Sequence, residues 1–505
     1  MMIDGQTAAG YYHNLTAERE PFLRRARDVS KLTLPTLVPP EGHSNQTLPT
    51  PYQGLGARGI NSLASKLLLA LFPPNQSFIR LRLSPDALAQ LGEGQARSEV
   101  DAALAGIEKA LDAEMESRAL RPYLHEAKKH LLVSGNAVLY IPREGQAKVY
   151  HLKDFVIKRD PSGNVLAMVI REQISPRALP QEVLEGAGQI DANAEFVEIY
   201  TAIVLEDDKY RVCQEVGGEM IPNSEGFYKP EHLPWIPLRM ETISGQSYGY
   251  GYVASLLGDL ASLEGLMKAL VEAAAISART VFLVNPSAST KISHLNRADN
   301  GSFVSGMSDD IAALRVDKGA DMSVAFQAIE QLTRSLGFSF LLNQSVQRSG
   351  ERVTAEEIRF LAQELEDVLA GTYSLLAQEE QLPIVRLMLH HMERRGDIQK
   401  LDGVATPTIV TGLEALGRGH DLIRLDTFVQ GAGQVLGPQA LMQYLNTGDY
   451  LTRRATAVGI QSSGLIRSEE EVQQMNQQQQ QAALLQTATP EAIRQMGNQM
   501  SNGGE

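Results

Sequence analysis

Residues 245–249 have the one residue pattern in this sequence that is typical of a nucleophilic enzyme. The segment reads GQSYG and matches the G-x-S-x-G pattern of serine hydrolases letter for letter. In those enzymes an apolar strand leads directly into the serine, and an acid and a histidine complete the site. No such strand precedes Ser247, and its partners cannot be picked out among ten histidines. We therefore interpret the segment as a junction that packs tyrosines ahead of a long helix, and predict no catalytic residue.

Metal and nucleotide chemistry are equally weakly supported. His125 and His130 stand five residues apart, about 500° around a helix, whereas two ligands on one helix face need a spacing of four. His390 and His391 are adjacent and diverge on a helix. No Gly-Lys-Ser/Thr sequence occurs, which excludes a P-loop, and the single cysteine, Cys213, provides no thiolate cluster. We expect neither a metal nor a cofactor.

Composition indicates a globular, acidic protein. The chain has 505 residues, of which 43% are hydrophobic and 21% charged, so it can form a sizeable core and should hold two or more compact units. The formal net charge of −14 argues against a broad nucleic-acid-binding surface. The longest apolar run, residues 67–72, is far too short to span a membrane and ends at Pro73. The N-terminus lacks the pattern of a secretory signal, and we expect folding in the cytoplasm.

Hydrophobic periodicity predicts an α+β fold that is mainly helical. Helices are expected from Thr16 as N-cap, over residues 55–72, and from Ser98 as the start of a capping box. Short alternating runs then predict a β-rich module at about 137–238. Its strands are expected at residues 137–141, 165–171, 196–205 and 210–216.

The second half predicts two helices that flank a small insertion. A long helix is expected at about 253–277, a β-like excursion at about 280–322, and a further helix at about 323–341. A polar loop at 343–352 follows. Thr354 then opens a helix that could reach Arg394, with a kink at Pro383. The end of the chain is rich in glutamine and of low complexity.

The polar loop concentrates side chains suited to phosphate contacts. It combines two arginines with amide side chains in a strongly acidic chain. Such residues contact phosphates without distinguishing bases. The loop residues of this kind are Asn343, Gln344, Gln347, Arg348 and Arg352.

From about Tyr11 to Gln480 the sequence resembles the portal proteins of podoviruses, in particular the autographivirus-like group. Five stretches in the same order carry the resemblance. They are residues 56–67 (GARGINSLASKL), 133–140 (VSGNAVLY), 258–264 (GDLASLE), 347–359 (QRSGERVTAEEIR) and 412–419 (GLEALGRG). The low-complexity tail departs from the family, so nothing is carried over to residues 482–505.

The resemblance implies a phage portal fold of wing, stem, clip and crown that assembles as a dodecameric ring around an axial channel. By similarity, the wing would comprise residues 1–252, including the β-rich module. The stem helices would be 253–278 and 323–341, separated by a clip at 279–322. A tunnel loop at 342–353, a long wing helix at 354–406, a crown at 407–480 and the tail at 481–505 would follow.

The implied function is that of a head-to-tail connector at one capsid vertex, a virion component assembled in the host cytoplasm. Double-stranded DNA would pass through the channel during packaging and ejection. The implied partners are the terminase large subunit, the major capsid and scaffolding proteins, tail adaptor or nozzle proteins and internal core proteins. The tunnel loop would touch DNA, and the channel-lining stem residues would be Asp259, Glu264 and Lys268.

Two other classes of protein remain as alternatives. A nuclease or hydrolase using Ser247 or a carboxylate cluster predicts turnover by a monomer or small oligomer. A different structural virion protein, such as a tail adaptor, would lack the order of helix, insert, helix, loop and long helix. Within the portal interpretation, Arg348 and Arg352 could face DNA, or pair with Glu351 or Glu356 of neighbouring subunits.

Overall fold

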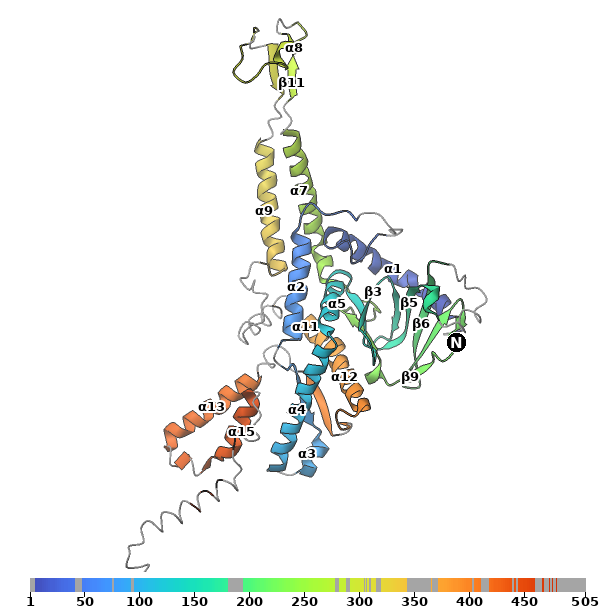
Figure 1. The fold of residues 1–505 in the computed structure, drawn as a ribbon, viewed down its shortest axis with the longest axis vertical. Coiled ribbons are helices and arrows are strands. Elements are labelled where there is room, and N and C mark those ends of the chain that lie inside the picture. Colours follow the sequence, from blue (N-terminus) through green and yellow to red (C-terminus); the bar gives the residue numbers. More distant parts are fainter. Residues whose placement is uncertain are drawn as a thin grey trace, which may run out of the picture. The chain divides into compact units, whose positions relative to one another are not determined.

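Figure 1 shows the chain in a computed structural model. The structure describes residues 5–40, 48–74, 77–91, 95–179, 194–277, 281–287, 291–303, 310–314, 319–342, 371–401, 404–409, 417–437 and 444–458, with a few single positions besides. The chain forms two compact units. Unit 1 comprises Met1–Ser84 and Glu108–Thr411, and unit 2 comprises Pro85–Ile107 and Gly412–Glu505. Helices and antiparallel sheets both occur, in agreement with the expected α+β class.

Two of the N-terminal helices, α1 and α4, begin earlier than the sequence predicted. Helix α1 spans Ala8–Leu32, and Thr7 caps it by accepting a hydrogen bond from Gly10 N. The prediction of Thr16 as N-cap is wrong, because its hydroxyl donates to the carbonyl of His13 inside the helix. Helix α2 spans Leu55–Leu71. Helix α3 (Pro85–Leu91) is followed by α4 (Gln95–Ser117), which starts three residues before the expected cap at Ser98, and α5 spans Leu120–Ser134.

Two antiparallel sheets form the β-rich module of unit 1, in the part of the chain that the structure describes. Strands β2 (Asn136–Tyr140), β3 (Lys148–His151) and β10 (Trp235–Arg239) pair in the order β10-β2-β3. The larger sheet has the order β4-β5-β6-β7-β8, with β9 beside β7. Its strands are β4 (Phe155–Arg159), β5 (Val165–Ile174), β6 (Val197–Glu206), β7 (Lys209–Val216), β8 (Glu219–Met220) and β9 (Gly226–Tyr228). The four strands expected from the sequence are thereby confirmed.

Helix α1 covers one face of the larger sheet. It packs against β4, β5 and β6. Tyr12 is buried in an apolar cluster that includes Val156, Val169 and Cys213, so the single thiol is a buried core residue. The Tyr12 hydroxyl donates to the carbonyl of Lys153 at 2.8 Å. This packing explains the early start of α1, because the helix must extend to Ala8 to cover the sheet.

Two long helices leave the module side by side (Figure 1). A 3₁₀ turn, η3 (Tyr252–Leu256), leads into α7 (Leu257–Ser277), and α9 (Gly319–Ser339) packs against α7. Between them in sequence lie β11 (Val281–Val284), α8 (Ile292–Leu295) and β12 (Ile311–Leu314), with the two strands paired antiparallel. The predicted order of helix, small insertion and helix is confirmed. The return helix begins at Gly319, where the sequence suggested about 323.

Of the helix predicted from Thr354 to Arg394, the structure describes the part from Gly371 onward, and the predicted start at Thr354 lies outside the described residues. It runs as α11 (Gly371–Leu376), a π-helical turn η5 (Ala377–Gln381), and α12 (Leu382–Arg395). The irregularity expected at Pro383 therefore takes the form of a π-turn directly before it. Residues 405–409 form strand β13 (Ala405–Ile409), which pairs antiparallel with β1 (Ile79–Leu83). This strand crosses the boundary expected at 407, and unit 2 resumes at Gly412.

Unit 2 contains α13 (Gly417–Leu436) and α15 (Thr447–Val458), which pack against each other. Asp426 links them by accepting a hydrogen bond from the Tyr450 hydroxyl at 2.7 Å and by pairing with Arg454 at 3.4 Å.

Candidate functional site

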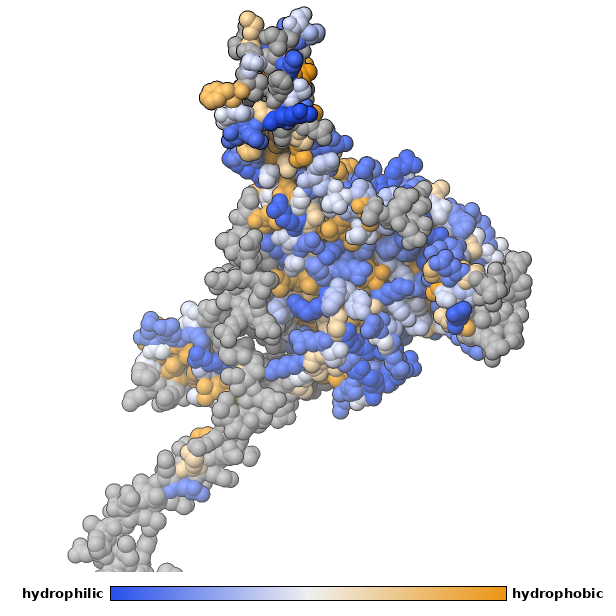
Figure 2. All heavy atoms as spheres, turned by 45° about the horizontal axis from the view of Figure 1, so that its top comes forward, coloured by the Kyte–Doolittle hydropathy of each residue, from blue (hydrophilic) through white to orange (hydrophobic). Residues whose placement is uncertain are grey.

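The paired helices α7 and α9 are exposed along much of their length and carry apolar side chains on that exposed surface. Figure 2 shows hydrophobic atoms on the surface of this helical projection. The large exposed apolar residues are Val271, Ile276, Val324, Phe326 and Phe338, of which Phe326 is 60% and Phe338 68% exposed. In the insertion between the helices, Phe303 and Met307 are also exposed. Exposed apolar surface of this kind is typical of sites that contact another protein, a membrane or a ligand.

Helix α2 fixes the end of α9, where the polar loop begins. A side chain at Gly59 would collide with the ring of Phe340. The buried ammonium of Lys66 donates to the carbonyl of Leu341 at 2.7 Å, and Leu341 has a positive φ of 54°. Both Gly59 and Lys66 belong to the stretch 56–67 that carried the resemblance. That stretch therefore holds the last turn before the polar loop.

A second junction fixes the start of the projection. The Asn136 amide exchanges two hydrogen bonds with the backbone of Gly249, donating to its carbonyl at 2.8 Å and accepting from its N–H at 2.7 Å. A Cβ at Gly251 would lie 2.5 Å from the carbonyl oxygen of Val133. A side chain at Gly135, whose φ is +75°, would likewise collide with the backbone of Tyr250. The stretches 133–140 and 248–251 thus interlock, and only glycine allows their backbones to approach.

The predicted stem residues have different surroundings. Asp259 and Lys268 are exposed, and Lys268 lies 4.0 Å from Glu272 on the next turn of α7. The carboxylate of Glu264 is half-buried and accepts hydrogen bonds from the backbone N–H groups of Tyr52 and Gln53, at 3.0 and 3.1 Å. Glu264 therefore holds the chain that enters α2, a contact that the helical periodicity of residues 253–277 could not reveal.

The predicted tunnel-loop residues Asn343, Gln344, Gln347, Arg348 and Arg352 lie outside the described residues. The last described position before them is Leu342, whose N–H donates to the carbonyl of Gly337 at 2.8 Å. The residues just before the loop, Phe340 and Leu341, are held in place by their contacts with Gly59 and Lys66.

A buried ion pair that the sequence did not reveal holds the π-turn η5, which follows the polar loop in the sequence. Lys128 on α5 contacts Glu380 in η5, and both side chains are fully buried. Burial lowers the pKa of Lys128, and the charge of Glu380 opposes that shift. In the same π-turn Glu379 pairs with Arg239 on β10, and the Gln381 amide donates to the carbonyl of Leu71. Three consecutive side chains thus attach this turn to α5, β10 and α2.

Ser247 and His130, which come from the motifs that suggested catalysis and metal binding, are both buried in the fold. Ser247 is buried, and its hydroxyl oxygen accepts a hydrogen bond from Arg159 N at 3.3 Å. His130 is buried, and burial lowers its pKa to about 4. Among the described residues, no cluster of three His, Cys, Asp or Glu side chains is arranged to hold a metal ion. Within that same part of the chain, no helix has the length and apolar character to cross a membrane.

The sequence relationships define the class of protein. Residues 5–466 match the model of the bacteriophage head-to-tail connecting protein family. The chain therefore belongs to this family of structural connectors and is not an enzyme.

Curated relatives then define the particular role. The portal protein of Escherichia phage T7 is 42% identical over 479 residues, covering 92% of this chain and 89% of the relative. The portal protein of Enterobacteria phage T3 is 42% identical, covering 93% and 89%, and that of Enterobacteria phage SP6 is 30% identical, covering 92% and 90%. The function is accordingly that of a podovirus portal, the virion connector at the head-tail junction.

Two solved structures show a distant likeness. A chain from the neck of an empty GTA particle superposes with a TM-score of 0.37 at 8% identity, over 81% of this chain and 90% of that one. A chain from the neck of the native GTA particle gives 0.34 at 10% identity, with the same coverages.

Proposed function

We propose that the chain assembles as a dodecameric ring whose stem, α7 and α9, surrounds an axial channel for double-stranded DNA. The exposed apolar side chains of these two helices are the observation that carries the proposal. Full burial of a Val, Ile or Phe side chain contributes about 1.5–3 kcal/mol, so several of them on each subunit favour association. In a ring with cyclic symmetry each subunit contacts its two neighbours through two different surfaces, so apolar side chains on both sides of the helix pair would be covered.

The remaining parts take the roles that the family suggests. Residues 1–252 and the helix after the loop would form the wing, and 279–322 the clip that faces the motor and the tail. The tunnel loop would lie at 342–353 and the crown at 407–480. The anchor formed by Gly59, Lys66 and Leu341 supports this assignment, because a loop that touches DNA needs a rigid base.

The channel would bind DNA weakly along most of its length and contact it more strongly at one constriction. The net charge of −14 disfavours tight binding of phosphates, so DNA slides without a deep minimum. Asp259 and Lys268 are exposed and available to the lumen. Glu264 would line it only with the part of its carboxylate that the backbone of Tyr52 and Gln53 leaves open. Arg348 and Arg352 would provide the contact with DNA at the constriction.

The partners would be the terminase large subunit during packaging, the capsid and scaffolding proteins during assembly in the host cytoplasm, and tail adaptor and core proteins in the virion. Movement of the loop and stem under internal DNA pressure would signal that the head is full.

Electron microscopy of the purified chain tests the ring. We expect particles with twelvefold symmetry and an axial hole. The double variant Val324→Glu/Phe326→Glu should yield monomers or small oligomers, because each charge would have to be buried between subunits. Arg24→Gln/Lys31→Gln on the exposed face of α1 lowers the net charge by the same two units and should keep the ring. Unchanged rings in the Val324/Phe326 variant would show that this surface is not the interface.

A packaging assay tests the loop. Arg348→Glu/Arg352→Glu should change the packaged genome length or the retention of DNA, whereas Arg24→Glu/Lys31→Glu on the exposed face of α1 should not. Normal filling and retention in the loop variant would exclude the proposed contact.

A further inference from the structure

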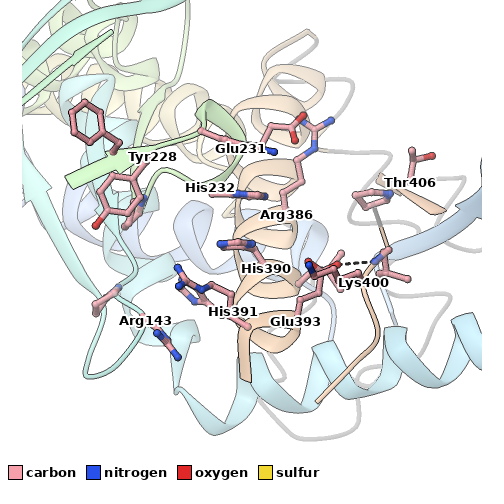
Figure 3. Close-up of a pocket in the computed structure, with 18 of the residues that line it drawn as sticks. Arg143, Tyr228, Glu231, His232, Arg386, His390, His391, Glu393, Lys400 and Thr406 are labelled. Atoms are coloured by element: carbon pink, nitrogen blue, oxygen red, sulfur yellow. Dashed lines mark hydrogen bonds and ion pairs between the residues drawn. The ribbon is translucent and has the colours of Figure 1, made fainter. Parts of the chain in front are cut away.

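Unit 1 contains a cavity of about 780 Å³ that none of the roles above uses. Its walls come from the end of β2 and the residues after it, the segment from Phe227 to Pro234, helix α12, and residues 400–401 and 405–407. Figure 3 shows these side chains converging from separate elements. Arg118 fixes one wall, because its guanidinium donates to the carbonyls of Pro142 and Arg143 at 2.9 and 3.0 Å. These hydrogen bonds hold that wall of the cavity in place.

The lining is strongly cationic. Arg143, Lys229, Arg394 and Lys400 line the cavity, and none of them forms an ion pair within the described residues. A fifth cation, Arg386, lies 3.6 Å from Glu231.

The carboxylates of the lining do not balance these cations. Glu231 faces Arg386, and Glu393 accepts a hydrogen bond from Leu401 N at 2.8 Å. Five cations against two occupied carboxylates leave a concentrated positive field in a chain whose net charge is −14. A concave site of one sign attracts ligands of the opposite charge.

Three histidines strengthen the case that the cavity receives a polar ligand. The rings of His232 and His390 stack with centroids 3.7 Å apart, and Figure 3 shows the two rings one above the other. His391 lines the cavity, is only 5% exposed, and its Nδ1 has no hydrogen-bond partner among the described residues. A buried ring nitrogen without a partner is costly, and the three imidazoles add hydrogen-bonding groups to the lining.

The apolar part of the lining indicates the class of ligand. Phe227 lines the cavity and is 62% exposed, and Tyr140 stacks on Trp235 with centroids 4.8 Å apart. The volume lies within the roughly 300–1,000 Å³ that is typical of pockets for sizeable organic ligands. A single inorganic anion would leave most of it empty. A DNA duplex is stiff over about 150 base pairs and can only touch the rim of a cavity. A flexible peptide can place both carboxylates and an apolar side chain inside.

We propose that this cavity binds an acidic peptide segment of a partner protein. Its carboxylates would pair with Arg143, Lys229, Arg394 and Lys400, and an apolar side chain would pack against Phe227. The lining shares no residue with the stem surface or with residues 342–353, so the site can be tested without reference to the channel.

Fluorescence anisotropy with the full-length chain tests the proposal. The probe is a short fluorescein-labelled peptide of alternating glutamate and leucine, titrated at low and at physiological salt. We expect binding that weakens with salt, and a loss of affinity of about tenfold or more in Arg143→Glu/Arg394→Glu. The control Arg24→Glu/Lys31→Glu makes the same change of charge on α1, away from the lining residues, and should bind like the unmodified chain.

The results distinguish specific peptide binding from non-specific electrostatic attraction and from nucleic-acid binding. Equal affinity in all three proteins, or an equal loss in both variants, would overturn the proposal, since the peptide would then follow net charge alone. Tighter binding of a short single-stranded DNA, lost in the same variant, would replace the peptide by nucleic acid as the ligand. If Arg143→Glu/Arg394→Glu fails to fold, Lys229→Glu/Lys400→Glu changes two exposed cations of the same cavity and decides the question instead.

Discussion

Replacing Lys128 by methionine should destabilise unit 1 more than any change to a surface ion pair. Lys128 and Glu380 are both fully buried, so no solvent screens the charge that would remain. The second carboxylate oxygen of Glu380, Oε1, already lacks a hydrogen-bond partner among the described residues, so Lys128→Met would leave both oxygens unpaired. Breaking a buried pair in this way costs about 3–5 kcal/mol.

The double variant Lys128→Met/Glu380→Leu should recover most of that loss. Replacing both charges by apolar side chains of similar size is often neutral or stabilising, because the desolvation cost of the ions disappears. The exposed pair of Lys158 and Glu18, 3.0 Å apart, is the matched control, and Lys158→Met should cost no more than about 1 kcal/mol.

Trp235, the single tryptophan, provides the assay. It lies on β10, which packs against η5, so its fluorescence during urea unfolding reports on the region of the pair. The free energies of the two single variants and the double variant close a mutant cycle. If Lys128→Met unfolds at the same urea concentration as the unmodified chain, or if the double variant is no more stable than the single ones, the reasoning about this pair is wrong.

Two further predictions concern backbone contacts and pH. Gly251→Ala should strongly reduce soluble expression or thermal stability, because its Cβ would lie 2.5 Å from the carbonyl oxygen of Val133. The control Gly258→Ala has open space around it and should be neutral or stabilising by up to about 1 kcal/mol. Equal melting temperatures of the two variants would contradict this prediction. Burial lowers the pKa of His130 to about 4, and burial with the nearby charges of Arg118, His390 and Arg143 lowers that of His391 to about 4. Since the unfolded chain binds these protons near pH 6.5 and the folded chain does not, stability should fall as pH drops from about 6.5 to 4, by up to about 1.4 kcal/mol per pH unit for each histidine. His130→Phe should flatten that dependence in urea titrations, and an unchanged slope would show that His130 is not responsible.

Local sequence patterns predicted the elements well where the element's own residues determine it. The alternating runs gave the strands β2, β5, β6 and β7, and the three- and four-residue spacing of leucines gave α7. The N-cap of α1 was predicted nine residues too late, at Thr16 where the structure has Thr7, because the burial of Ala8 and Tyr12 depends on a sheet distant in sequence. The π-turn η5 was expected only as a kink, since the contacts of Glu379, Glu380 and Gln381 come from three other elements.

The stem residue Glu264 illustrates the same limit at a single side chain. The resemblance to portal proteins implied a common channel-lining role for Asp259, Glu264 and Lys268, which all lie on α7. Only the folded chain shows that the Glu264 carboxylate binds the backbone at Tyr52 and Gln53.

The sequence by itself determined the family and the order of helices, β-rich module and inserted segment, because these depend on residue types and on spacing along the chain. Only the tertiary structure decided which side chains meet. Lys128 and Glu380 are 252 positions apart, Lys66 and Leu341 are 275 apart, and Arg143 and Arg394 come to one cavity from different elements. Contacts of this range depend on how whole elements pack, and a local pattern contains no information about them.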